Sequence, residues 1–143
     1  MNRYLIGTIF YCISTLISAQ TSLRYNDNQT LTYDEVIKAY AEIDGEYENA
    51  VLREFGTTDS GKPLHVFFIS SGKLNVDGGV DTWKKDKAVL LVNNGIHPGE
   101  SCGIDASIVF ARELLEKGVP ENILVAIIPV YNIGGSLNRG CCS

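Results

Sequence analysis

Apolar residues recur at helical spacing between Val36 and Ile43, so this stretch is predicted to form an amphipathic helix. Thr32 and Glu35 precede it in the pattern of a capping box, in which each side chain hydrogen-bonds the backbone N–H of the other residue. Gly45 is expected to end or interrupt the helix. Its expected role is to pack on one face of a sheet.

Two short apolar segments follow, Val51–Phe55 and Leu64–Ile69. The link between them, Gly56–Pro63, is rich in residues that favour turns. Together they predict an antiparallel hairpin.

The clearest pattern in the chain is strand, helix, strand. The apolar runs Ala88–Val92 and Ile123–Ile128 are continuous, which favours strands buried on both faces. Between them, Gly103–Lys117 carries an apolar stripe of helical period, and Gly118 and Pro120 stop it. This is a βαβ unit with a parallel strand pair and a right-handed crossover. The predicted fold class is α/β: a mixed sheet with an N-terminal hairpin, a parallel βαβ unit and helices on the faces.

The remaining stretches are expected to be loops. Ser70–Asp86 carries Trp83, whose ring is expected to pack on the domain. Asn132–Gly140 follows the last strand with no element after it, which would leave one side of Ile123–Ile128 uncovered. An uncovered apolar strand edge promotes association. We therefore expect residues 31–143 to be the front part of a larger domain, cut short.

The N-terminal residues are predicted to form a targeting segment. Residues 1–19 combine a positive start, an apolar region too short to span a bilayer and a small-residue cleavage site, which is typical of a signal peptide. Residues 20–30 are polar and are expected to be a flexible lead-in. The expected location is therefore exported, secreted or periplasmic, with no stable membrane insertion after cleavage.

Composition narrows the function. The 143 residues suffice for one domain, and a net charge of −5 argues against nucleic acid or an anionic membrane as partner. Three cysteines lie beyond the signal segment, Cys102, Cys141 and Cys142. An odd number does not make a disulfide framework. Cys102 is expected to be a small buried residue at a helix start.

The chemistry centres on His97 and Glu100, which directly follow the strand Ala88–Val92. Ligands of α/β sheets bind beyond the carboxyl ends of strands. Residues three apart in a tight helical turn project to the same side, so an imidazole and a carboxylate here can share Zn²⁺. The alternative is an ordinary turn with a surface histidine and a glutamate favoured by the helix dipole. His65 is interpreted as a strand histidine without a metal role, because it lies at the start of its strand.

Asn94–Glu100 resembles the zinc-binding segment of the zinc metallocarboxypeptidases of the carboxypeptidase A/B/T type. Phe55–Leu64 resembles the early hairpin of that family, and Ile128–Asn132 resembles the end of the strand after its first crossover helix. The likeness covers about Leu31–Asn138, well under half of a complete family domain.

The resemblance implies a zinc hydrolase that releases C-terminal residues from peptides and proteins, with His97 and Glu100 as two of three protein ligands. The third ligand, a histidine, and the general base, a glutamate, come later in the family and are missing here, since no histidine follows Glu100. The family holds the substrate carboxylate with an Asn-Arg pair. Arg139 is the candidate for that role, although Ser136 stands where the family has Asp and a solvated loop arginine is the alternative.

We therefore expect this chain to be inactive alone. The alternatives are a related zinc amidohydrolase or deacylase, and a non-catalytic exported binding domain.

Overall fold

The structure is a computed structural model, and it describes residues 21–97 and 99–138. The signal-peptide segment, Arg139, Cys141 and Cys142 lie outside the described residues. In chain order the elements are the 3-10 turn η1 (Tyr25–Asp27), α1 (Tyr33–Glu46), β1 (Ala50–Thr57), β2 (Pro63–Ile69), the 3-10 turn η2 (Val76–Gly78), α2 (Gly79–Trp83), β3 (Ala88–Asn93), α3 (Cys102–Lys117), β4 (Ile123–Ile128) and α4 (Ile133–Leu137).

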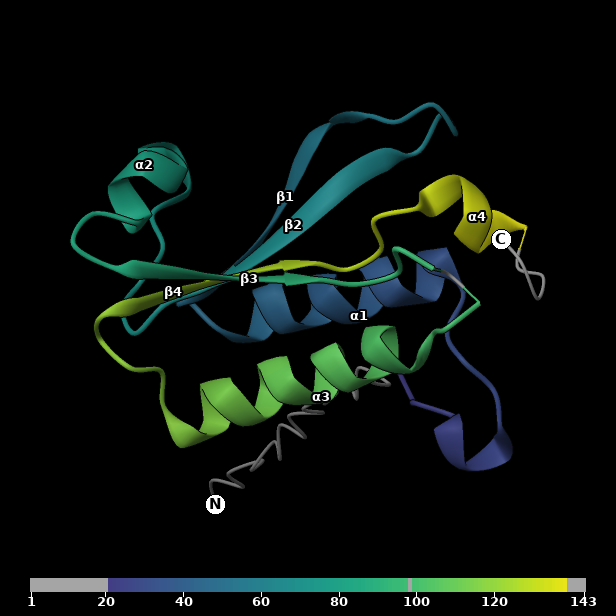
Figure 1. The fold of residues 1–143 in the computed structure, drawn as a ribbon. Coiled ribbons are helices and arrows are strands. Elements are labelled where there is room, and N and C mark those ends of the chain that lie inside the picture. The colour runs from purple at the N-terminus through teal and green to yellow at the C-terminus, as the bar shows by residue number, and fades with distance from the viewer. Residues whose placement is uncertain (1–20, 98, 139–143) are drawn as a thin grey trace, which may run out of the picture.

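The strands form one mixed sheet in the order β1-β2-β4-β3. β2 pairs antiparallel with β1 and with β4, whereas β3 and β4 run parallel. The long helices α1 and α3 cover one face of the sheet, and α2 lies on the other side (Figure 1). The predicted fold class, with its hairpin and its βαβ unit, is confirmed.

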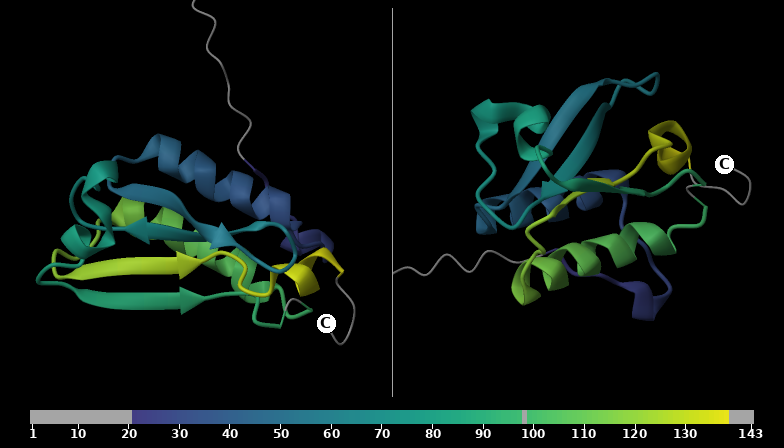
Figure 2. Two further views of the ribbon diagram at one scale, coloured as in Figure 1. Left: turned by 90° about the horizontal axis from the view of Figure 1, so that it is seen from above. Right: turned by 60° about the vertical axis from the view of Figure 1, so that its left-hand side comes forward.

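The prediction was wrong about which strand is at the edge. β4 lies between β2 and β3, so the strand expected to be uncovered is central, and β3 is an edge strand (Figure 2). β3 was expected to be buried on both faces, but Val89, Leu90 and Leu91 are 52%, 47% and 58% exposed. The association hazard therefore belongs to β3.

Apolar side chains fill both faces of the sheet. The larger cluster lies between the sheet and the helices α1 and α3, where the rings of Tyr40 and Phe67 lie 4.8 Å apart. The smaller cluster lies under α2, where Trp83 meets Phe68 edge to face at 5.4 Å. The Trp83 indole N–H donates to the Asn75 carbonyl at 3.0 Å. Trp83 thus packs on the domain as predicted, but from a short helix in the middle of the expected loop.

The start of α1 is held as the capping box predicts. Glu35 N–H donates to the Thr32 hydroxyl at 3.4 Å, and Thr32 N–H donates to the Glu35 carboxylate at 2.8 Å. Arg24 grips the same carboxylate with two hydrogen bonds of 3.0 and 3.1 Å. Arg24 and then Thr32 lower the pKa of Glu35 to about 2.

The segment before α1, which its composition predicts to be a flexible lead-in, makes specific contacts with α1. It contains η1, and the Thr21 backbone and hydroxyl both donate to the Glu42 carboxylate. These contacts arise because α1 presents acidic side chains along the path of the segment. Gly45 does not end α1, which continues to Glu46.

The loop expected at 132–140 contains a short helix, α4. The Asn132 side chain caps it by accepting from the Gly135 N–H at 2.9 Å. Within residues 21–97 and 99–138, no helix has the length and apolar character needed to cross a membrane.

Candidate metal centre

The candidate site lies where β3 and β4 end together. Asn93 is paired with Ile128 in the parallel register, and Asn94 N–H donates to the Ile128 carbonyl at 3.2 Å. The two strand ends are therefore neighbours, as the βαβ pattern predicted. The turn that carries His97 and Glu100 leaves from this edge and enters α3 at Cys102.

Backbone hydrogen bonds fix the first part of this turn to the segment after β4. Tyr131 N–H donates to the Asn94 carbonyl at 2.8 Å, and Asn132 N–H donates to the Gly95 carbonyl at 3.0 Å. Gly95 has φ +65°, which L side chains rarely adopt. A Cβ built at Gly95 would lie 3.2 Å from Val130 Cγ1. Only glycine fits this position without a shift of its neighbours.

A buried polar network anchors the same turn to both long helices. The Asn94 amide donates to the Ser107 hydroxyl oxygen at 2.8 Å, and the Ser107 hydroxyl donates to the Ile104 carbonyl at 2.9 Å. The Tyr40 hydroxyl lies 2.8 Å from the Ser107 hydroxyl. Asn94 and Ser107 are buried, and burial raises the pKa of Tyr40. Because buried polar groups are costly when unpaired, this network holds the end of β3 in one position.

The two proposed metal donors are both exposed to solvent. Glu100 N–H donates to the His97 carbonyl at 2.9 Å, so a tight turn joins the two residues. An imidazole and a carboxylate are suitable zinc donors, but a catalytic zinc site needs a third protein ligand. In the part of the chain that the structure describes, no three His, Cys, Asp or Glu side chains are grouped to hold a metal ion. The described residues therefore do not complete a zinc site.

No protein-family model matches the chain, and neither does any curated protein. The fold, however, matches solved structures. Carboxypeptidase A from Helicoverpa armigera superposes with a TM-score of 0.62 at 20% identity, over 78% of this chain and 27% of that one. Thrombin-activatable fibrinolysis inhibitor gives 0.59 at 18% identity, over 85% and 30%. Its bovine form in complex with tick carboxypeptidase inhibitor gives 0.58 at 17% identity, over 79% and 34%.

The chain has part of the metallocarboxypeptidase fold. It spans about a third or less of the length of these structures. At these identities the likeness concerns the fold, and the roles of single residues rest on the geometry of this chain.

His65 lies at the edge of the sheet where β3 and β4 end. Its position at the start of β2 therefore does not separate it from the candidate site, contrary to the sequence analysis. Its strand runs antiparallel to β4, so the start of β2 lies beside the end of β4. The surroundings of His65, and not its position in the strand, argue against a metal role. It is 8% exposed, with Nδ1 3.3 Å from the Tyr33 hydroxyl and Nε2 3.5 Å from the Glu54 carboxylate. Both ring nitrogens therefore already face protein partners.

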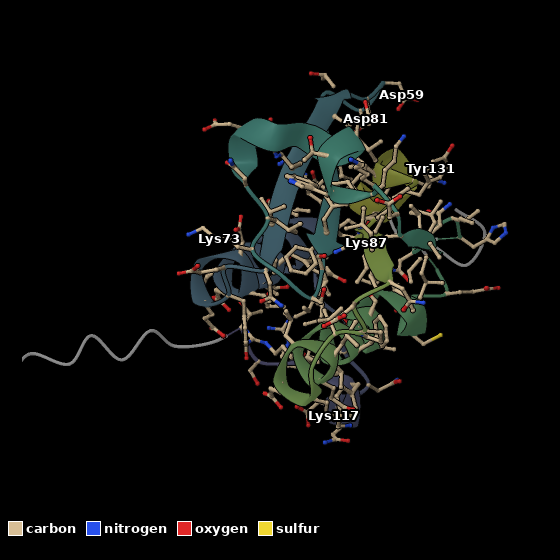
Figure 3. All side chains as sticks on the ribbon, turned by 90° about the vertical axis from the view of Figure 1, so that its left-hand side faces the viewer. Asp59, Lys73, Asp81, Lys87, Lys117 and Tyr131 are labelled. Carbon is tan, nitrogen blue, oxygen red and sulfur yellow. The ribbon has the colours of Figure 1, made fainter. Side chains whose placement is uncertain are left out.

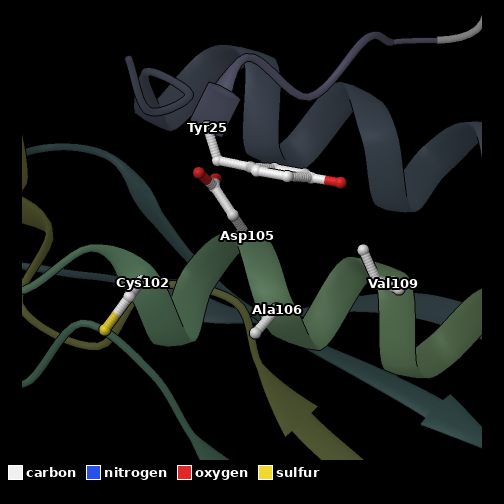
Figure 4. Close-up of a pocket in the computed structure, with 5 residues that line it drawn as sticks. All are labelled: Tyr25, Cys102, Asp105, Ala106 and Val109. Atoms are coloured by element: carbon white, nitrogen blue, oxygen red, sulfur yellow. The ribbon is translucent and has the colours of Figure 1, made fainter. Parts of the chain in front are cut away.

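Cys102 was expected to be buried, but it is exposed at the first residue of α3. The helix turns it outward because Ile104 and Ile108 take the inward positions. It borders a mainly apolar hollow of about 390 Å³ between η1 and α3, with the Tyr25 ring lying across it (Figure 4). Asp105, on the next turn of α3, is buried beneath this ring and is not at the strand-end edge.

A second hollow of about 390 Å³ lies at the strand-end edge itself. The turn from Asn94 to Glu100, which carries the two proposed donors and is called the metal turn below, forms one wall. The β1–β2 turn, β2 and the segment after β4 form the others. The lining residues are Thr58, Asp59, Leu64, Ile96, Tyr131, Asn132 and Ile133. The segment after β4 therefore borders the candidate site, and so does the hairpin, whose contribution was not predicted from the sequence. The antiparallel pairing of β2 with β4 is the signal that places the hairpin turn there.

Proposed function

We propose that this chain is the zinc-binding front part of a zinc metallocarboxypeptidase catalytic domain that hydrolyses C-terminal residues from peptides. His97 and Glu100 are proposed to supply two of its three protein ligands. A zinc ion held by three protein donors acts as a Lewis acid toward a substrate carbonyl group. We also propose that residues 1–19 direct export.

One observation carries this proposal. The His-Pro-Gly-Glu turn leaves the sheet at the edge where the parallel strands β3 and β4 end, in a chain with part of the metallocarboxypeptidase fold. Ligand sites of α/β sheets form at this edge. The chain's own residues give the turn a fixed origin through Gly95 and the Asn94–Ser107 hydrogen bond, while both donor residues stay accessible.

The proposal includes inactivity of the chain by itself. Two donors leave the site one protein ligand short, and the described residues offer no third. Peptidase activity would therefore need the part of the domain that this chain does not contain. Arg139, which is outside the described residues, is proposed to bind the substrate carboxylate, because a guanidinium can grip a carboxylate with two hydrogen bonds.

Zinc binding can be tested residue by residue, because the chain has only two histidines. In a ¹⁵N-labelled chain, Zn²⁺ should shift the imidazole signals of His97 and leave those of buried His65 in place. His97→Gln and Glu100→Gln should each weaken binding about tenfold or more, since each removes one of two donors. Glu113→Gln, a matched change on the exposed side of α3, should leave binding unchanged.

Equal shifts of both histidines, or unchanged affinity in His97→Gln, would disprove the metal assignment. Tight binding of one zinc per chain would disprove the claim that a ligand is missing. Release of C-terminal residues from a blocked dipeptide, lost in His97→Gln, would disprove inactivity. Metal binding by a reconstituted full domain with release of acyl groups in place of C-terminal residues would favour a deacylase.

A further inference from the structure

The hollow at the strand-end edge, next to the metal turn, has walls that are tied together. Ile96 lies one residue before His97 and lines it from the turn. Tyr131 and Asn132 line it from the segment after β4, and their N–H groups donate to the turn at 2.8 and 3.0 Å. The turn between β1 and β2 forms the third wall. It lies against the segment after β4, since a Cβ built at Gly134 would lie 3.7 Å from the Ser60 side chain. The hollow is therefore a built feature of the fold.

Among the described residues that line this hollow, Asp59 alone supplies a carboxylate. The nearest lysine along the hairpin, Lys62, pairs with Asp34 at 3.0 Å. Within residues 21–97 and 99–138, Asp59 forms no ion pair. The neighbouring Thr58 hydroxyl is occupied within the turn, where it donates to the Lys62 carbonyl at 2.7 Å. The Asp59 carboxylate is exposed on the hairpin turn, where a ligand in the hollow can reach it.

The rest of the lining is suited to an aliphatic chain with a polar end. Leu64, Ile96 and Ile133 are apolar, whereas Tyr131 adds a phenol from an exposed position. A volume of about 390 Å³ lies within the ordinary range of small-ligand sites. Lysine and arginine side chains bury their methylene stems on apolar surface and keep the charged group beside an acceptor.

We propose that this hollow is a subsite for a basic side chain of the peptide substrate, and that Asp59 is its specificity-determining residue. This inference rests on the proposed function, because it takes the metal turn as the reacting centre. The peptide's lysine or arginine would lie with its stem against Ile96 and Ile133 and its charge at Asp59. The metal ligands themselves play no part in holding that side chain.

The test is a titration of the ¹⁵N-labelled chain with blocked single residues: N-acetyl-arginine methylamide, the norleucine equivalent and the glutamate equivalent. The arginine probe should shift the backbone amides of Ile96, Tyr131 and Asn132. Asp59→Asn should weaken its binding about fivefold, as expected for an exposed charge pair. Asp81→Asn, the same charge change on α2, should have no effect. Figure 3 labels Asp81, which lies on α2, together with Asp59 and Tyr131, which line the hollow.

Equal binding of the three probes would overturn the proposal, and so would an unchanged arginine affinity in Asp59→Asn. The variant lies on an exposed turn, and a preserved amide spectrum would show that it folds. His97→Gln separates this proposal from the proposed function. It should lose zinc binding and keep arginine binding. If the wild-type chain binds zinc through His97 but not the arginine probe, only the subsite is wrong.

Discussion

Replacing Gly95 by alanine tests whether the metal turn is fixed by close packing. The alanine backbone would have to keep φ near +65°, which costs an L residue about 1–2 kcal/mol. Its Cβ would also press against Val130 Cγ1 at 3.2 Å and Ile104 Cδ1 at 3.3 Å. Overpacking of this kind typically costs ~1–3 kcal/mol. We therefore expect Gly95→Ala to lower the free energy of unfolding by about 2–5 kcal/mol.

The matched control is Gly61→Ala in the hairpin turn. Gly61 has a similar φ of +76°, but a Cβ there would meet nothing within 4 Å. It should therefore lose only the backbone part, about 1–2 kcal/mol. Urea unfolding followed by the fluorescence of Trp83, the single tryptophan, measures both variants. With a urea slope of about 2 kcal/mol/M, Gly95→Ala should lower the midpoint by about 1–2.5 M.

If the two variants lose the same stability within about 0.5 kcal/mol, the close contacts at Gly95 contribute nothing and the packing argument is wrong. The comparison also bears on the metal turn. Gly95→Ala should reduce the zinc-induced shift of the His97 imidazole signals, because displacing the backbone at residue 95 also displaces the turn that carries His97. Gly61→Ala should leave that shift unchanged.

Three further predictions concern other parts of the chain. Glu35 has a pKa of about 2 when folded, against an ordinary 4.5, so its stabilising effect is complete above pH 4.5 and is lost as the pH falls toward 2. In Glu35→Gln, the free energy of unfolding measured as a function of pH should lack this acid-dependent contribution. The contribution is at most ~1 kcal/mol, because the site is partly exposed. Leu91→Lys on the edge strand should reduce self-association in sedimentation experiments, whereas Val109→Lys on α3 should reduce it less. Tyr40→Phe should cost about 1 kcal/mol in urea unfolding, since it removes one buried hydrogen bond to Ser107.

Local patterns explain which elements the sequence could predict. The capping box at Thr32 and Glu35 and the apolar stripe of α3 depend on residues three or four positions apart, and both appear as expected. The single turn α2 was missed because five residues are too few to show a helical period. It forms because Trp83 has a sheet face to cover, which is a tertiary effect.

Strand order could not be read from the same patterns. The apolar runs of β3 and β4 look alike, yet only β4 is flanked on both sides. The apolar character of a run shows that a strand can be buried. The order in which the strands pair in the sheet decides which strand is buried. The misjudged surroundings of His65 have the same origin. Without the antiparallel pairing of β2 and β4, the start of β2 could not be placed beside the end of β4.

The site shows where sequence reasoning reaches its limit. The motif identified His97 and Glu100, but the residues that hold their turn are Gly95, Asn94 and Ser107, which carry no metal chemistry. A site works when its donors are fixed by surrounding contacts. Here the fixing lies in the folded core, and both donor residues remain in solvent. In the proposed function, the task of this chain is to place the two proposed donors. Affinity for the metal depends on whether a third protein donor is brought to the same edge.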